Sequence, residues 1–247
     1  MSETSLQQRA KTADRARIAE TFVSVQGEGK LTGVPSWFCR VSGCNLRCTW
    51  CDTPYASWSP EGDARTVEDL VAEASGSGVG HAVLTGGEPM LFDAVGTLAA
   101  ELRARGMHIT IETAGTIHRD FACDLLSLSP KLANSTPAAG DARDPAGVWR
   151  ERHEQRRLPM DTLRALLADY PERQLKFVIA SESDLPEIES LVAALGDLAP
   201  SDVMLMPEGV TVPDRAQTEW VTRACVERGW RYCPRLHIEL FGDTRGT

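Results

Sequence analysis

Short apolar segments typical of β-strands alternate with amphipathic segments typical of helices along most of this 247-residue chain. The alternation predicts a mostly parallel sheet, because parallel neighbours need a crossover connection that is usually a helix. The strand pattern occurs at residues 18–25, 36–41, 81–85, 108–112, 124–129, 174–180 and 203–206. Helical periodicity or helix-end residues mark 66–74, 92–105, 161–168, 185–195 and 215–228, with Thr66 as the cap of the first helix.

About six mostly parallel strands are too few to close an eight-stranded barrel, so the predicted fold is α/β with an incomplete, TIM-type barrel. A doubly wound open sheet is the alternative, and the alternation alone does not separate the two. Residues 1–17 are expected to form a polar N-terminal extension, and residues 18–247 a single domain. A variable loop near 132–158, with one helical turn, and a C-terminal tail complete the expected organisation. Within that loop, residues 150–157 (RERHEQRR) are expected to form a solvated loop or a short helix.

Three of the seven cysteines stand close together in the segment CNLRCTWC, where Cys44, Cys48 and Cys51 have the spacing C-x3-C-x2-C. Their thiolates can converge on one inorganic centre. They do not complete the four-cysteine coordination of a structural zinc site or of a fully cysteine-ligated cluster. A fourth ligand has to come from Cys39, a distant residue or a non-protein molecule. The spacing favours a three-cysteine iron–sulfur cluster with one iron open to a substrate or cofactor.

The other four cysteines, Cys39, Cys123, Cys225 and Cys233, are expected to pack as small apolar side chains. An odd count argues against a disulfide framework, and clustered cysteines without an apolar leader indicate a reducing compartment. No run reaches the roughly 18 apolar residues of a membrane span. The expected location is therefore the cytoplasm, with no membrane partner.

The charge balance narrows the class of partner. The chain has 26 basic and 35 acidic residues and a formal net charge of −9, which argues against non-specific nucleic-acid binding. The expected partner is a small molecule rather than a nucleic acid.

The cysteine segment resembles the signature of the radical S-adenosylmethionine (SAM) superfamily, and Trp50 before the last cysteine fits that signature. A second motif, GGEP at 86–89, follows the strand predicted at 81–85. The resemblance implies that Cys44, Cys48 and Cys51 bind a [4Fe–4S] cluster and that SAM chelates the fourth iron. It implies further that the GGEP motif contacts the SAM amino group.

More specific segments resemble the 7-carboxy-7-deazaguanine synthase family, from about residue 20 to 247 except for the 132–158 loop. They are VQGEG at 25–29, FCRVSGCNLRCTWCDT at 38–53, VLTGGEP at 83–89, ETAGT at 112–116, SPK at 129–131, LKFVI at 175–179 and the tail RLHIELFGDTRGT. The resemblance implies conversion of 6-carboxy-5,6,7,8-tetrahydropterin to 7-carboxy-7-deazaguanine with loss of ammonia, using SAM and Mg²⁺. It also implies a homodimer and an electron donor such as flavodoxin or ferredoxin.

The same resemblance assigns site residues. The residues expected at SAM are Trp50, Gly86, Gly87, Glu88, Glu112, Thr113, Gly115, Ser129, Lys131 and Lys176. Those expected at the substrate are Val25, Gln26, Gly27, Glu28, Arg40, Thr85, His237 and Thr247, the last through its carboxylate. Thr53 is the expected Mg²⁺ ligand, with Asp52 in support.

Several of these residues also have ordinary interpretations. Residues 26–29 can form a polar β-turn, Asp52 can cap a helix, and an isolated lysine is usually solvated. Arg40 stands beside the cysteine segment, where a planar guanidinium suits capture of a carboxylate. Met206 occupies a position where the family more often has glutamine, so a polar contact is expected to be missing or replaced there.

Histidine positions and two other functions complete the expectations. His81 and His108 open predicted strands, whereas His118 and His153 are expected at exposed loop positions. Another radical SAM enzyme, such as a glycyl-radical activase, shares the cysteine spacing and a GGEP-like motif. A non-enzymatic zinc or electron-transfer module is the alternative from a different functional class.

Overall fold

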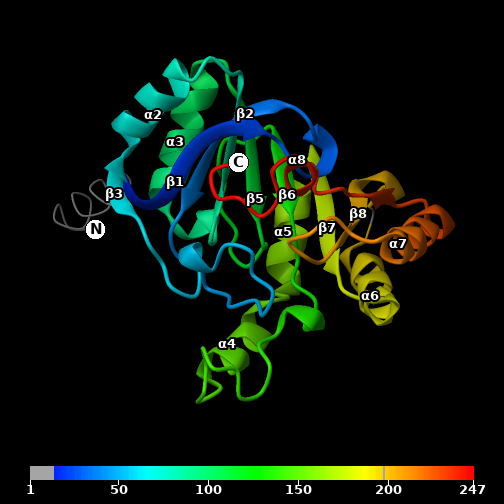
Figure 1. Ribbon diagram of the computed structural model, residues 1–247. Helices are drawn as coiled ribbons and strands as arrows, with labels where there is room; N and C mark the ends of the chain where they lie inside the picture. Colours follow the sequence, from blue (N-terminus) through cyan, green and yellow to red (C-terminus); the bar gives the residue numbers. More distant parts are fainter. Residues whose placement is uncertain (1–13, 197) are drawn as a thin grey trace.

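A single nine-stranded sheet runs through the part of the chain that the computed structural model describes, residues 14–196 and 198–247. Its strand order is β3-β1-β2-β4-β5-β6-β7-β8-β9 (Figure 1). The strands are β1 (Arg15–Val25), β2 (Pro35–Val41), β3 (Asp63–Thr66), β4 (His81–Gly86), β5 (His108–Thr113), β6 (Leu125–Leu128), β7 (Arg173–Ile179), β8 (Val203–Pro207) and β9 (Arg231–Tyr232). The helices are α2 (Val67–Gly76), α3 (Asp93–Ala104), α4 (Val148–Arg156), α5 (Met160–Asp169), α6 (Leu185–Leu195), α7 (Arg215–Arg228) and α8 (Leu236–Phe241).

The strand order decides between the two sheet types. From β2 through β4 to β9 every neighbouring pair is parallel, and each crossover adds the next strand on the same side. A doubly wound sheet would reverse direction, whereas crossovers of one hand that never reverse place their helices on one face. Figure 1 shows α2 and α3 beside the strands at one end of the sheet and α6 and α7 beside those at the other. The expectation of an incomplete barrel is confirmed, with antiparallel β1 and β3 at one edge.

Alternation along each strand separates the helix-covered core from the opposite face. In β7, Leu175, Phe177 and Ile179 are fully buried in the main apolar cluster with the helices. Lys176 and Val178, between them, point to the other face and line a pocket. The same alternation repeats in β2, where Trp37, Cys39 and Val41 enter the core and Phe38 and Arg40 line the pocket.

Most predicted elements occur close to the expected positions. Helices α6 and α7 have the predicted bounds, and Thr66 caps α2 by accepting a hydrogen bond from the backbone N–H of Asp69 at 3.1 Å. His81 and His108 are the first residues of β4 and β5, as expected. All seven cysteines are free, and Cys39 is buried in the core.

Three expectations need correction. The first strand begins at Arg15, so residues 15–17 belong to the sheet rather than to a polar extension; the rest of that extension, residues 1–13, lies outside the described residues. The loop expected at 132–158 contains α4, a helix of 9 residues, so of the two interpretations of 150–157 the short helix is correct, and it is longer than the one turn expected. His153, expected to be exposed, lies on this helix with 0% of its surface accessible. The short strands β3 and β9 and the tail helix α8 were not predicted, because two to six residues carry too little periodicity.

None of the helices in the described ranges is both long and apolar enough to cross a membrane.

Candidate active site

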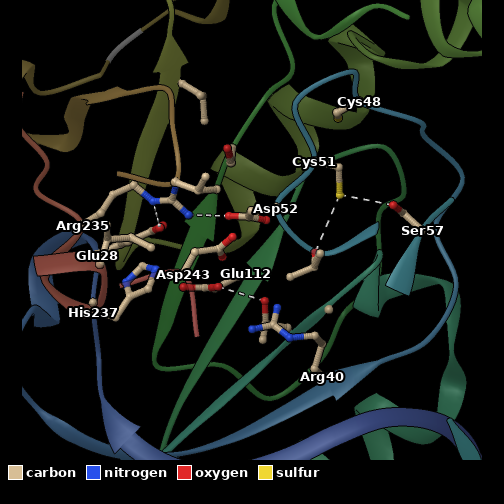
Figure 2. A pocket seen from close by; sticks show the side chains of 18 of the residues that line it. Glu28, Arg40, Cys48, Cys51, Asp52, Ser57, Glu112, Arg235, His237 and Asp243 are labelled. Carbon is tan, nitrogen blue, oxygen red and sulfur yellow. Dashed lines mark hydrogen bonds and ion pairs between the residues drawn. The ribbon is translucent and has the colours of Figure 1, made fainter. Parts of the chain in front are cut away.

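A pocket of about 600 Å³ opens on the sheet face opposite the helices, over the carboxyl ends of the parallel strands. Of the ligand residues expected from the sequence, all line this pocket except Glu88 and Gly115. Figure 2 shows the labelled cysteines on one side of the pocket, with Glu28, Arg235 and His237 on the other. Glu28 and His237, which are 209 residues apart in the sequence, thus lie side by side.

The cysteine loop (residues 44–51) follows β2 and packs directly against the GGEP turn (residues 86–89). The backbone N–H groups of Gly87 and Glu88 donate to the carbonyl oxygens of Val41 and Gly43, at 3.0 and 2.9 Å. A Cβ atom on Gly87 would lie 2.0 Å from the Gly43 carbonyl oxygen. Glycine is required there because the two backbones touch, a reason beyond any contact with SAM.

Glu88 does not face the pocket. Its carboxylate is fully buried and accepts hydrogen bonds from the Thr113 hydroxyl at 2.7 Å and from the Ala114 and Met90 N–H groups at 2.9 and 3.1 Å. The side chain therefore fixes the end of β5, on which Thr113 lines the pocket.

Gly115 also lies outside the pocket. It has a φ of +73°, and a Cβ there would approach Leu128 and Leu163 to 2.5 Å each. This glycine permits the turn after β5 to pack on the core.

Two of the three thiols, Cys44 and Cys48, lie in a site that disfavours a bare anion. Burial raises the pKa of Cys44 to about 12, and burial also raises the pKa of Cys48 well above its usual value. Thiolates in such surroundings need a cation to compensate them, so this donor set fits a bound iron–sulfur cluster. Among the described residues, no group of three His, Cys, Asp or Glu side chains is arranged to hold a single metal ion. A [4Fe–4S] cluster would be held by Cys44, Cys48 and Cys51, each on its own iron, so the three thiols need not meet at one ion.

Glu112 connects three elements in the middle of the pocket. Its carboxylate accepts hydrogen bonds from the Gln26 amide at 3.0 Å and from the Thr85 hydroxyl at 2.9 Å. The loop after β1 and the ends of β4 and β5 are thereby held in one geometry. Farther along the pocket, the Lys131 ammonium donates to the Ser129 hydroxyl at 2.8 Å and lies 5.6 Å from the centre of the Trp50 ring.

A chain of charged side chains, buried except for Asp52, lines the side opposite the cysteines. Glu28 pairs with Lys176. Glu28 also pairs with Arg235, and Arg235 pairs with Asp52 (Figure 2). Burial would raise the pKa of Glu28, but the charges of Lys176 and Arg235 outweigh burial and hold it far below its usual range. Asp52 therefore forms an ion pair and does not cap a helix. Gly27 lets the His237 ring lie against the loop, since a Cβ there would come within 1.9 Å of the ring.

Arg40 is held by a cluster of hydrogen bonds centred on Glu20. Its Nε donates to Glu20 at 2.7 Å, and Glu20 also accepts from the Tyr55 hydroxyl at 2.7 Å and from Arg245 at 3.1 Å. Among the described residues, no acceptor meets the two terminal nitrogens of Arg40. Figure 2 shows its guanidinium directed toward the side of the pocket where Glu112 and Asp243 lie.

Sequence reasoning missed Arg235, Glu20, Tyr55 and Arg245, because each acts through a partner remote in the chain. Arg235 stands two residues before His237, and this i, i+2 placement was the only available signal. Met206 is buried in a small apolar cluster with Val178, Met204 and Cys233, on which Trp50 packs. An apolar contact thus stands at this position, where a polar contact is expected to be missing or replaced.

Comparison with known proteins agrees with this geometry. The radical SAM superfamily profile matches residues 39–168, which include the cysteine loop, the GGEP turn and α4. A 7-carboxy-7-deazaguanine synthase of Rhodopirellula baltica is 50% identical over 231 residues, covering 93% of this chain and 88% of the relative. The chain belongs to the 7-carboxy-7-deazaguanine synthase family. A second family member, from Halobacterium salinarum, is 47% identical over 100% of this chain and 99% of its own length.

Solved structures agree with the family assignment. The crystal structure of QueE from Escherichia coli superposes with a TM-score of 0.65 and 25% identity, over 96% of this chain and 100% of that one. Streptococcus suis SuiB bound to S-adenosylmethionine shares the fold, with a TM-score of 0.50 and 14% identity over 76% of this chain and 47% of that one. As a member of this family the chain is a radical SAM enzyme, and its superfamily cofactors are a [4Fe–4S] cluster and SAM.

Proposed function

We propose that this chain converts 6-carboxy-5,6,7,8-tetrahydropterin to 7-carboxy-7-deazaguanine with loss of ammonia. One observation carries the proposal: a single pocket joins the three-cysteine loop to an arginine, carboxylates and an amide suited to a small carboxylated pterin. The family name of the relatives gives the product.

The cofactor side of the pocket is proposed to hold the cluster on Cys44, Cys48 and Cys51. The SAM contacts are proposed for Trp50, Gly86, Gly87, Glu112, Thr113, Ser129, Lys131 and Lys176, all of which line the pocket. The bound cluster and SAM would supply the radical chemistry, whereas the protein supplies position and excludes water. Glu88 and Gly115 are proposed to act indirectly, by shaping the strand end on which Thr113 lies.

The substrate side is proposed to bind the pterin by charge and by its hydrogen-bonding edge. With its Nε bound to Glu20, Arg40 keeps two donors for a carboxylate, and a paired guanidinium–carboxylate contact fixes orientation. Gln26, Glu28 and Glu112 offer amide and carboxylate groups for the N–H and C=O edge of the ring. Val25, Gly27, Thr85, His237 and Thr247 also line this part of the pocket.

Mg²⁺ is proposed to bind at Thr53. The Thr53 hydroxyl lies 3.7 Å from the Cys51 sulfur, at the border between cofactor and substrate sides. Mg²⁺ takes few protein ligands and completes its shell with water and substrate oxygens, so one hydroxyl beside a carboxylate substrate suffices. Asp52, paired with Arg235, is proposed as a support rather than a ligand.

Three further features belong to the same proposal. The reductant would be a one-electron donor such as flavodoxin or ferredoxin, and the enzyme would act as a homodimer in the cytoplasm. Seven free cysteines support a reducing compartment. Light scattering of the purified enzyme would test the dimer, and a single-chain mass would contradict it.

The decisive experiment is anaerobic incubation of the reconstituted enzyme with SAM, a reductant, Mg²⁺ and 6-carboxytetrahydropterin. Mass spectrometry should then detect 7-carboxy-7-deazaguanine and methionine. The C48S variant should lose cluster iron, SAM cleavage and product, whereas C123S, which replaces a half-buried cysteine outside the pocket, should keep them. A colourless wild-type protein containing zinc instead of iron would overturn the proposal.

A further inference from the structure

The segment between residues 134 and 156 holds the backbone of the cysteine loop from one side. The Thr49 N–H donates to the Ser135 carbonyl at 2.8 Å, and Arg143 donates to the Thr49 carbonyl at 3.1 Å. The Arg156 guanidinium donates to the Asn45 carbonyl at 3.3 Å. These contacts all fall on residues that lie between cysteines, so the segment is built around the loop.

His153 makes the buried contact among them. Its Nδ1 accepts from the Arg47 backbone N–H at 3.1 Å, and its Nε2 lies 2.9 Å from the Ser135 hydroxyl. The Ser135 hydroxyl donates to the Leu132 carbonyl at 2.6 Å, which leaves its oxygen to accept from Nε2–H. Both partners thus select the same neutral tautomer of His153.

The Arg47 side chain is fixed against the loop as well. Its Nη1 donates to the carbonyl oxygens of Cys44 and Leu46, at 2.7 Å each, and the residue is 7% exposed. The guanidinium carbon lies 3.9 Å from the centre of the Trp149 ring on α4. The two hydrogen bonds from Nη1 hold the positive charge against the backbone of the cysteine loop, directly at Cys44.

We propose that helix α4 braces the cysteine loop, and that His153 and Trp149 are positioning residues that hold the Arg47 guanidinium beside the cluster and raise its reduction potential. The inference rests on the proposed function, because it requires the cluster. A reduced cluster carries one more negative charge than the oxidised form, so a nearby fixed cation stabilises it preferentially. Neither His153 nor Trp149 lines the pocket.

The test is a redox titration of the anaerobically reconstituted full chain without substrate, followed by the electron paramagnetic resonance signal of the reduced cluster. Four variants are compared with the wild type: R47Q, H153L, H153N and H118L. Asparagine and leucine have similar shapes, but only asparagine places an acceptor near the position of Nδ1. His118 is an exposed histidine on a loop, so H118L is the control for the exchange itself.

At a fixed solution potential, the ratio of reduced to oxidised cluster should fall about tenfold in R47Q, which for a one-electron couple is a shift of about 59 mV. H153L should shift the potential in the same direction. H153N should restore most of the wild-type value, and H118L should leave it unchanged. Because His153 acts through Arg47, the double variant R47Q/H153L should titrate like R47Q alone.

A wild-type potential in H153L with a full complement of cluster iron would overturn the inference. If H153L does not fold, W149L removes the ring beneath Arg47 and leaves the hydrogen bonds of His153 intact; an unchanged potential in W149L would then overturn it. Failure of the proposed function would look different: a wild type that holds the cluster but forms no 7-carboxy-7-deazaguanine would contradict the proposed substrate, and a wild type that holds no cluster would contradict the radical SAM chemistry itself.

Discussion

Among single residues, the ion pair between Glu28 and Lys176 is the most deeply placed charge contact of the pocket. The Lys176 side chain is 7% exposed and that of Glu28 is 14% exposed. Removing one partner of a buried pair leaves an uncompensated charge, whereas replacing both by uncharged groups can be almost neutral. The pair therefore affects the free energy of unfolding mainly through the balance of its charges.

The K176M variant should lower the free energy of unfolding by about 3 kcal/mol, the lower end of the range for a broken buried pair, since Arg235 still compensates Glu28. The double variant E28Q/K176M should recover a large part of this loss. Urea denaturation monitored by circular dichroism measures both. If the double variant is at least as unstable as K176M, charge imbalance is not the cause.

His153 gives stability a specific dependence on pH. Burial lowers the pKa of His153 to about 4, compared with about 6.5 for a histidine in the unfolded chain. Above pH 6.5 the ring is neutral in both states and its contribution is complete. As the pH falls from about 6.5 towards 4, the unfolded state takes up the proton first, and up to about 3 kcal/mol of stability is lost.

Wild type and H153N should therefore differ in how their free energy of unfolding changes between pH 7 and pH 4.5. The wild type should lose more over this interval, because asparagine does not titrate. Denaturation at several pH values tests the difference. Parallel pH profiles of the two proteins would contradict the assignment.

Between elements, the contact of the GGEP turn with the cysteine loop is a close approach of two backbones. A Cβ on Gly87 would lie 2.0 Å from the Gly43 carbonyl oxygen and 2.7 Å from that of Ala56. Neither neighbour is the flexible end of a side chain. The loop has to move if this glycine is replaced.

The G87A variant should lose about 3 kcal/mol of stability, as overpacked sites do, and should retain less cluster iron after reconstitution. The matched control is G76A at the end of α2, where a Cβ meets no atom within 4 Å and φ is not positive. This control should be neutral or stabilising by about 0.5 kcal/mol. Iron analysis measures the cluster content of both variants, and thermal denaturation measures their stability. A G87A variant with full cluster iron and wild-type stability would show that the turn adapts to the added methyl group.

Helix α4 illustrates why a helix can be indistinguishable from a solvated loop in the sequence. Residues 150–157, which comprise most of α4 and its C-cap, read RERHEQRR and are polar on every side, so no apolar stripe marks a helix. The helix forms because Trp149 and His153 find partners on the cysteine loop, about 100 residues earlier in the chain. Hydrophobic periodicity in the sequence reveals a helix that packs on the apolar core, but it does not reveal a helix held by a few specific contacts.

For the molecule as a whole, the C-terminal tail returns to line the pocket. Arg245 pairs with Glu20 at 3.1 Å and with Glu61 at 3.0 Å, and its guanidinium stacks 4.0 Å from the centre of the Tyr55 ring. Thr244 and Thr247 line the pocket next to it. Single exposed pairs contribute about 0–1 kcal/mol, so these contacts hold the tail rather than the fold.

The R245Q variant should leave the melting temperature nearly unchanged but loosen the tail. If R245Q removes about 1 kcal/mol of the free energy that holds the tail at the pocket, KM for the pterin should rise about fivefold, and kcat should change less. Limited proteolysis should cut the tail faster. E61Q, which removes only one exposed ion pair, serves as the control. Equal protease sensitivity of R245Q and wild type would show that Arg245 does not hold the tail.

Local patterns in the sequence determined the order of the long strands and helices, because alternation and capping are properties of neighbouring residues. They also predicted the three-cysteine loop and GGEP turn, since both motifs are continuous in the chain. The tertiary structure alone decided that the sheet does not reverse, that Glu88 supports a strand end, and that α4 braces the cysteine loop. It also brought Arg235 and Arg245 to the pocket. Those outcomes depend on contacts between residues tens to hundreds of positions apart, which spacing along one chain does not encode.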